Sequence, residues 1–287
     1  MPLHSDIVGA ATEPMAHQVD ARWLMAYAAA LGDLNPLYMD TQANTVIAHP
    51  VFPVCPEWPV ILDTRNMRAS GQLTAEESAR GVHAAHDLHI YRPIKAGDHI
   101  TTKATMIGAR AIRPGAAYTM RLDTVDAVSG DLLARTYQLG IYRGVAVAGG
   151  DASIETPPEL PDTTPFAAPL SQEIFVAEGA AHTYTECARI WNPIHTDRSV
   201  ALGAGLPDII LHGTATLALA VSRIINEYGG GDPRRVSRLG GRFSAMVLMP
   251  STITLQSERQ GDVIAYQVLT EDGDPAISNG FVCLSEG

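Results

Sequence analysis

The sequence predicts an α+β fold made of two similar units in tandem, each with an antiparallel sheet curled around a helix. The first observation is an internal repeat: the pattern Asn-Pro-x-x-x-Asp occurs twice, with Asn35 and Asn192 157 residues apart. The second is that the same order of elements surrounds each copy: a helix precedes it, and a second helix and a run of strands follow. A chain of 287 residues is long enough for two domains of modest size.

The first half of the chain begins with an Ala-rich helix expected over residues 20–31, which Gly32 ends. Pro56 and Pro59 follow the first motif, so we expect the helix after it to begin late or to be broken. Alternating apolar and polar residues, separated by turn-forming residues, then predict four strands over residues 86–91, 99–108, 118–125 and 132–142.

The second half repeats this order. A helix is expected over 182–190, and the strongest helical pattern of the chain, over 213–228, ends at three consecutive glycines. Four further strands are expected over residues 236–247, 251–256, 262–270 and 276–284. Five prolines between the halves predict an extended linker. The expected boundaries are residues 1–148 for the first repeat, 149–171 for the linker and 172–287 for the second repeat.

The composition is that of an ordinary globular protein, with 46% hydrophobic and 18% charged residues. The formal net charge of -11 provides no excess of positive charge for a nucleic-acid backbone, so a DNA or RNA partner is not expected. The three cysteines have no metal-ligand or disulfide-framework spacing. No secretion signal or membrane span is expected, because the N-terminus lacks an apolar stretch and polar residues interrupt segment 209–225. The expected location is a reducing cytoplasm.

Five sequence segments resemble the MaoC-like hotdog family, which includes (R)-specific enoyl-CoA hydratases and 3-hydroxyacyl-thioester dehydratases. They are ALGDLNPLY at 30–38, YRP at 91–93, GD at 97–98, NPIHTD at 192–197 and IILHG at 209–213. The resemblance covers nearly the whole chain, with a dehydratase-type first repeat and a catalytic second repeat. It implies a tandem double hotdog fold.

The same resemblance implies a hydro-lyase that adds water reversibly to an enoyl thioester. The family motif places the catalytic His at His195, the Gly whose N–H faces the thioester carbonyl at Gly213, and an orienting amide at Asn192. The position of the family's catalytic Asp is Ile190, which can neither accept nor donate a proton. In the first copy Asp33 is present, but the His position is a tyrosine, so neither copy holds a complete pair.

A carboxylate one helical turn before Ile190 is the local candidate for replacing that Asp. Glu186 lies four residues earlier on the expected helix. The alternative for Glu186 is a solvated side chain on the helix surface. Tyr184 is a second candidate, as a hydrogen-bond donor to the substrate, with packing as its alternative. Asp33 is not expected to pair with His195, because the two motifs occupy equivalent places in different repeats.

Substrate contacts are expected from His212 and from a basic cluster that follows the glycines, formed by Arg234, Arg235, Arg238 and Arg242. Coenzyme A has a pyrophosphate and a 3′-phosphate, which arginines bind well; a salt-bridged surface strand is the alternative. His83, His86 and His89 have helical metal-site spacing but lie in a strand pattern, where such spacing alternates faces. No metal is expected.

The substrate implied is an acyl-CoA or an acyl-carrier-protein thioester, with coenzyme A entering only as part of the substrate and no separate cofactor. A homodimer or higher oligomer is expected. Two alternatives stay open: a non-catalytic acyl-thioester-binding subunit, because Ile190 replaces the motif Asp, and a thioesterase, because thioester hydrolysis uses the same fold class.

Overall fold

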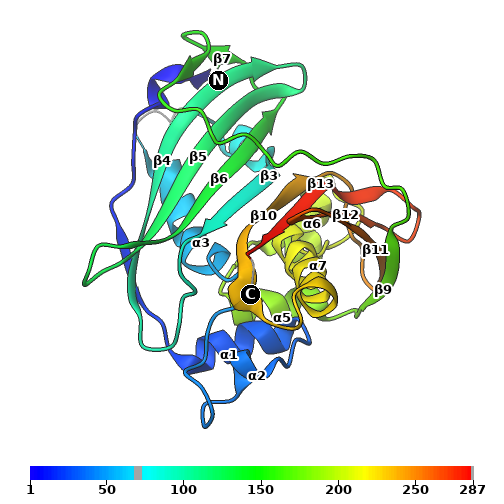
Figure 1. The fold of residues 1–287 in the computed structure, drawn as a ribbon. Helices are drawn as coiled ribbons and strands as arrows, with labels where there is room; N and C mark the ends of the chain where they lie inside the picture. Colours follow the sequence, from blue (N-terminus) through cyan, green and yellow to red (C-terminus); the bar gives the residue numbers. More distant parts are fainter. Residues whose placement is uncertain (68–72, 286–287) are drawn as a thin grey trace. The chain divides into compact units, whose positions relative to one another are not determined.

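The computed structural model describes residues 1–67 and 73–285 and shows an α+β fold (Figure 1). By contacts the chain divides into two compact units. Unit 1 comprises Met1–His17, Pro56–Leu88 and His99–Leu160, and unit 2 comprises Gln18–Cys55, His89–Asp98 and Pro161–Gly287. These units and the sequence repeats divide the chain by different criteria, so the repeat boundaries at residues 148 and 171 stay a prediction. No helix of the described residues is long and apolar enough to cross a membrane.

The elements of unit 1 are mainly strands. They are β1 (Leu3–His4), η1 (Ser5–Ile7), β2 (Met15–Gln18), α3 (Val54–Asp63), η2 (Thr64–Asn66), α4 (Ala75–Ala79), β3 (Gly81–Ile90), β4 (His99–Ile112), β5 (Gly115–Asp126), β6 (Leu132–Arg143), β7 (Val147–Ala148) and β8 (Ala152–Ser153). β2, α3 and β3 each have one end in unit 2. The sheet order is β2-β4-β5-β6-β3, with β8 paired to β4, and β1 pairs with β7 in a separate two-stranded sheet.

Unit 2 holds most of the helices. Its elements are α1 (Ala21–Ala30), α2 (Pro36–Met39), β9 (Leu170–Val176), α5 (Ala180–Ala188), η4 (Pro193–His195), α6 (Arg198–Gly203), α7 (Gly213–Tyr228), η5 (Pro233–Arg235), β10 (Val236–Phe243), β11 (Ser251–Gln260), β12 (Val263–Leu269) and β13 (Pro275–Leu284). The sheet order is β10-β13-β12-β11-β9. α7 packs against β10 to β13 (Figure 1) and buries a continuous apolar face, which explains why its pattern was the strongest in the sequence.

The two sheets have the same topology. In both, four strands follow the second helix; the strand before the first helix pairs with the second of the four, and the first of the four pairs with the last. Each sheet also places a glycine opposite an aromatic ring: Gly140 opposite Tyr118 in unit 1, and Gly280 opposite Tyr266 in unit 2. A Cβ atom at either glycine would collide with that ring, so the tyrosine covers a position that only glycine leaves open. The predicted duplication therefore extends to topology and packing.

The helix after the first motif corrects one expectation. α3 begins at Val54 and runs unbroken to Asp63, with Pro59 inside it. Pro56 lies in the first turn, where a helical N–H has no partner to lose, and Pro59 removes a single intrahelical bond. Val60 compensates, because it packs into a core with Met106 of β4 and other apolar residues of β4 and β5.

The predicted strands are confirmed with different ends. The expectation that the strand from residue 236 continues to 247 is wrong: β10 ends at Phe243. Past that point the Val247 carbonyl accepts from Leu211 N–H instead of joining the sheet. β9 was missed because it follows the Pro-rich stretch, where turn formers obscure its alternation.

Candidate active site

Both motif copies follow a helix that ends in a left-handed residue. Gly32, with φ of 66°, follows α1, and Arg189, with φ of 59°, follows α5. They are 157 residues apart, as are Asn35 and Asn192. Glycine adopts this conformation without strain, whereas Arg189 is held in it by capping the Thr185 carbonyl at the end of α5. The same backbone turn thus delivers each Asn-Pro pair.

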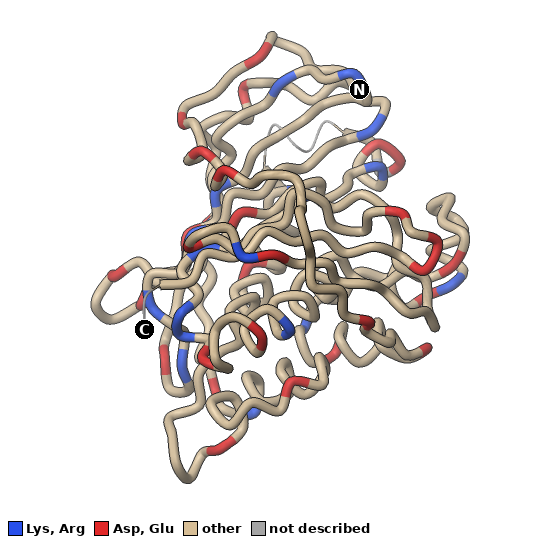
Figure 2. Tube along the Cα trace, turned by 45° about the vertical axis from the view of Figure 1, so that its right-hand side comes forward, with Lys and Arg blue, Asp and Glu red and all other residues tan. Residues whose placement is uncertain are grey.

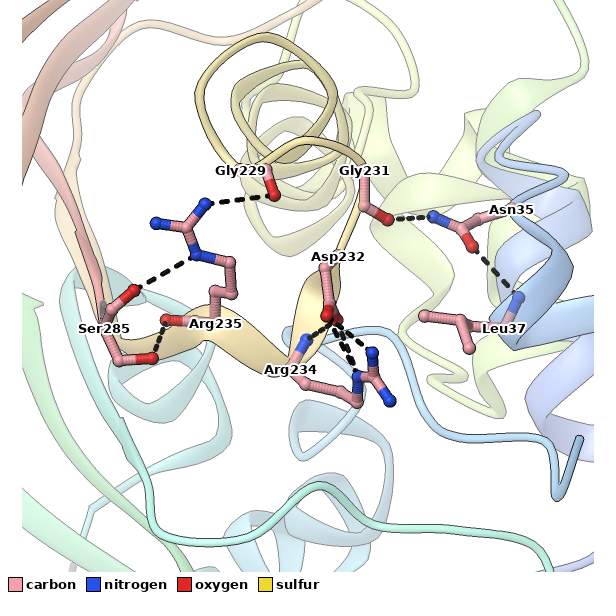
Figure 3. Close-up of polar contacts among 8 residues, drawn as sticks. All are labelled: Asn35, Leu37, Gly229, Gly231, Asp232, Arg234, Arg235 and Ser285. Atoms are coloured by element: carbon pink, nitrogen blue, oxygen red, sulfur yellow. Dashed lines mark hydrogen bonds and ion pairs between the residues drawn. The ribbon is translucent and has the colours of Figure 1, made fainter. Parts of the chain in front are cut away.

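The first motif connects α2 to the segment that follows α7. Asn35 accepts from Leu37 N–H at 3.0 Å, which caps α2, and its amide donates to the Gly231 carbonyl at 2.7 Å (Figure 3). Asp33 lines a cleft of about 520 Å³ between the loop 31–36 and the C-terminal half of α7. The first motif therefore holds the C-terminal end of α7.

The second motif lies at the opposite end of that helix. The His195 ring stacks on the ring of His212, the N-cap residue of α7, with centroids 3.7 Å apart. The cleft that Asp33 lines also includes Ser222. Ser222 lies ten residues after His212 on α7, which at a rise of 1.5 Å per residue is about 15 Å along the helix. This placement agrees with the expectation that Asp33 and His195 do not pair.

His195 is held in one protonation state and one tautomer. The Nδ1 atom lies 2.8 Å from the Ile210 carbonyl, and because a carbonyl oxygen only accepts, Nδ1 carries the hydrogen. Burial lowers the pKa of His195 to about 4, although the bond to Ile210 acts in the opposite direction. At neutral pH the imidazole is therefore uncharged, with its basic lone pair on Nε2.

His212 supports this arrangement as a second neutral imidazole. Its Nε2 atom lies 3.2 Å from Thr185 Oγ1 on α5. Burial, and secondarily the neighbouring His195, lower the pKa of His212 to about 2. The stacked pair is thus clamped from α5 by Thr185 and from the loop before α7 by Ile210. Thr185 was missed because a threonine inside a helix gives no motif.

The first turn of α7 offers two free N–H groups. Ala215 and Thr216 donate their N–H groups to the His212 carbonyl, at 3.0 and 3.1 Å. In the described part of the chain Gly213 and Thr214 have no such acceptor, so their N–H groups are the unpaired donors expected at a helix N-terminus. A Cβ at Gly213 would come within 3.1 Å of the Phe243 ring. Glycine there keeps this end of the helix accessible.

Ile190 and Glu186 occupy opposite environments. Ile190 is only 5% exposed, beside the buried imidazoles. Glu186 is exposed on α5, and within the described residues it forms no hydrogen bond to His195. Its exposure matches the alternative of a solvated helix-surface carboxylate, and a replacement role for Glu186 stays a prediction. Tyr184, by contrast, is buried and donates its hydroxyl proton to Thr214 Oγ1 at 3.1 Å.

The four arginines do not converge on one point. Arg234 pairs with Asp232 at 2.7 Å, and Arg235 donates to the Ser285 and Gly229 carbonyls (Figure 3). Arg238 lies over the Phe281 ring, and Arg242 is exposed on β10. Figure 2 shows basic residues dispersed among acidic ones in both units. A phosphate clamp built from these arginines stays a prediction.

The histidines of β3 approach each other more closely than strand alternation predicts. The His83 and His86 ring centroids lie 5.3 Å apart, and burial lowers the pKa of both residues, to about 3 and 4 respectively. His89 is half-buried. Across residues 1–67 and 73–285, no three His, Cys, Asp or Glu side chains are grouped closely enough to hold a metal ion.

Two family models match the chain. The MaoC-like domain matches residues 154–279, and the FAS1-like dehydratase domain region matches residues 6–131. The second half of the chain is a MaoC-like domain. The MaoC-like match covers the second repeat, which contains His195 and Gly213, and a catalytic role for this repeat stays a prediction.

Relatives of this MaoC-like protein include two curated enzymes. Peroxisomal enoyl-CoA hydratase 2 of Arabidopsis thaliana is 26% identical over 210 residues, covering 70% of this chain and 67% of the relative. 3-hydroxyacyl-thioester dehydratase Y of Mycobacterium tuberculosis is 27% identical over 285 residues, covering 96% of this chain and 95% of the relative.

Solved structures of the same fold cover nearly the whole MaoC-like chain. A MaoC-like dehydratase from Phytophthora capsici superposes with a TM-score of 0.82 at 19% identity, covering 98% of both chains. A Mycobacterium tuberculosis protein described as a double hotdog superposes with a TM-score of 0.64 at 14% identity, covering 96% of both chains. At these identities the likeness shows the fold alone, and it confirms the predicted tandem double hotdog.

Proposed function

We propose that this protein is a hydro-lyase that adds water reversibly across the double bond of an enoyl thioester. The observation that carries the proposal is the neutral His195, whose ring lies beside the α7 N-terminus with its two unpaired N–H groups. A proton acceptor next to a pair of oxyanion donors is what this reaction needs. The names of both curated relatives support the same reaction class.

Water, His195 and the two N–H groups of α7 are sufficient for the proposed reaction. His195 Nε2 takes a proton from water while the hydroxide oxygen bonds to the β-carbon of the enoyl thioester. The π electrons move to the thioester oxygen, which Gly213 and Thr214 N–H stabilise as an enolate. The imidazolium then gives its proton to the α-carbon. Because Ile190 cannot titrate, we propose that His195 both removes and returns the proton, while Asn192 orients the water.

The thioester carrier in this proposal is coenzyme A, with an acyl carrier protein as the alternative. No separate cofactor enters the step. Within the described chain Arg242 is the one arginine of the cluster whose guanidinium group has no hydrogen bond or ring contact. We therefore expect the phosphate contact from Arg242 before Arg234 or Arg235, whose guanidinium groups are already bonded. A homo-oligomer and a cytoplasmic location stay predictions, which light scattering and fractionation test.

The test is a panel of short, branched and dicarboxylic enoyl-CoA esters with the purified protein. We expect hydration of at least one ester by the wild type, and a 10²- to 10⁴-fold lower rate in His195→Ala with ligand binding retained. No hydration of any ester by the folded wild type contradicts the proposal. Activity that appears only with an added second hotdog chain supports the binding-subunit alternative instead. Release of free thiol without hydration supports a thioesterase.

A further inference from the structure

A buried chain of hydroxyl groups reaches from the first repeat to the N-terminus of α7. Tyr27 on α1 and Tyr184 on α5 have their hydroxyl oxygens 3.3 Å apart, and Tyr184 donates to Thr214 Oγ1 at 3.1 Å. Both tyrosine rings are almost fully buried, with centroids 5.7 Å apart. The two tyrosines are 157 residues apart, the same separation as Asn35 and Asn192. They are therefore equivalent residues of the two repeats that meet in unit 2.

The donors and acceptors along this series of hydroxyl groups follow from the number of protons that each group carries. A phenol has one hydroxyl proton, and Tyr184 donates its proton to Thr214. The proton between the two phenols must then come from Tyr27. Burial raises the pKa of both hydroxyls well above the usual range, so neither ionises near neutral pH. The order Tyr27 to Tyr184 to Thr214 is fixed.

The last hydroxyl group of this series, on Thr214, is next to the oxyanion donors. Thr214 supplies one of the two unpaired N–H groups of α7 and directly follows Gly213, which supplies the other. With Oγ1 held by Tyr184, the Thr214 side chain has one preferred orientation, and the first helical turn is tied to α5 and α1. The turn has no side-chain cap of its own, since His212 makes no side-chain capping bond.

We propose that Tyr27 and Tyr184 are positioning residues that fix the direction of the Gly213 and Thr214 N–H groups, with Tyr27 acting through Tyr184. The inference rests on the proposed hydration. It gives the non-catalytic repeat a role at the reacting carbonyl, because Tyr27 belongs to that repeat. Its consequence is that the two phenols work as one unit, so their removal is not additive.

The kinetic test uses Tyr184→Phe, Tyr27→Phe, the double variant and Thr214→Val, with Thr214→Ser as the conservative rescue. Tyr266→Phe is the matched control, because Tyr266 is equally buried and donates to the Gly240 carbonyl of the sheet instead of to a residue of α7. We expect kcat to fall about tenfold in Tyr184→Phe with KM unchanged, as for a misaligned oxyanion donor. The double variant should be no slower than Tyr184→Phe. Additive losses, or a kcat loss equal to that of Tyr266→Phe, overturn the proposal.

A second measurement is independent of turnover. The probe is butanoyl-CoA with a ¹³C carbonyl, a saturated thioester that cannot be hydrated, observed by isotope-edited infrared spectroscopy. We expect the bound carbonyl band to move to lower frequency in the wild type and in Tyr266→Phe, and to move less in Tyr184→Phe. A shift in Tyr184→Phe equal to the wild-type shift contradicts the positioning role and leaves the hydration proposal intact. If the wild type binds the probe without any shift of the carbonyl band, both the positioning role and the hydration proposal are contradicted. If the shift depends on Tyr184 but no enoyl thioester is hydrated, only the hydration proposal is contradicted.

Discussion

The pH profile of kcat/KM tests the assignment of His195 as a buried, neutral base. Catalysis needs the uncharged imidazole, and burial lowers the pKa of His195 to about 4. At pH 6 an imidazole with that pKa is about 99% neutral, whereas one with the ordinary value of about 6.5 is about 24% neutral. We therefore expect kcat/KM to stay level between pH 8 and pH 6 instead of falling about fourfold.

The assay follows the loss of ultraviolet absorbance of the enoyl thioester, at substrate concentrations well below KM. Circular dichroism at each pH checks the fold, because a buried histidine also lowers stability in acid. The unfolded chain binds a proton near pH 6.5 that the native state excludes, so the free energy of unfolding falls as the pH drops below that value. For His195 the loss is about 2 kcal/mol at pH 5, and His49 and His212, whose pKa values are about 3 and 2, change in the same direction.

His182→Gln is the matched control, because His182 is an exposed histidine in the first part of α5. Its pH profile should coincide with that of the wild type. A fourfold fall in kcat/KM between pH 8 and pH 6, with the circular dichroism unchanged and the same fall in His182→Gln, would show that an ordinary imidazole controls the rate. The low pKa assigned to His195 would then be refuted.

Three further predictions concern the twin motifs, the helix N-terminus and unit 1. Asn35→Ala should lower the free energy of unfolding by about 1 to 2 kcal/mol with kcat retained. Asn192→Ala removes no helix cap, so it should lower kcat with thermal stability retained. Equal effects of the two substitutions on kcat and on stability would contradict distinct roles. Gly213→Ala should lower kcat at least tenfold without loss of thermal stability, since the three atoms nearest to the added methyl group all belong to the Phe243 ring. Failure of Gly213→Ala/Phe243→Leu to recover kcat would show that crowding is not the cause. Burial raises the pKa of Glu57 to about 8, so the native state holds a proton that the unfolded state has lost, and stability falls as the pH rises from about 4.5 to 8. The stabilisation by Glu57→Gln, measured by urea unfolding, should therefore grow by about 2.5 kcal/mol between pH 5.5 and pH 7.5, and a constant difference would contradict an uncharged Glu57.

The sequence predicts the fold correctly where the hydrophobic periodicity and the turn-forming residues indicate the same elements. α7 has the bounds that its pattern predicts, and the four strands of each half are present with shifted ends, although the first of each four pairs with the last instead of with the second. The helix at Pro59 was misjudged because tertiary packing of Val60 outweighs one lost hydrogen bond. The contact units were not foreseen: α1 packs on α5 of the other repeat, an arrangement that depends on contacts between residues about 157 positions apart. No local pattern contains that information.

The sequence predicts site residues only where they belong to a recognisable motif. His195 and Gly213 follow from NPIH and LHG, and the structure brings both to the same end of α7 through the stacking on His212. Thr185 and Thr214 were not found, because hydroxyl residues inside helices have no characteristic spacing. Their roles depend on which buried group each one faces, and this is known only once the helices are packed.

The absence of an Asp at position 190 helps to explain the low pKa of His195. A carboxylate at position 190 would oppose desolvation and raise the pKa of the imidazole, whereas the buried Ile190 leaves desolvation almost unopposed. A base of pKa about 4 accepts a proton from water less readily than one near 6.5, so in the proposed hydration the transition state holds more of its negative charge on the thioester oxygen. Stabilisation of that oxygen by the Gly213 and Thr214 N–H groups then contributes a larger share of the rate. The loss of the carboxylate therefore makes the alignment of this helix N-terminus, and the two buried tyrosines behind it, more important to the reaction than in an Asp-His pair.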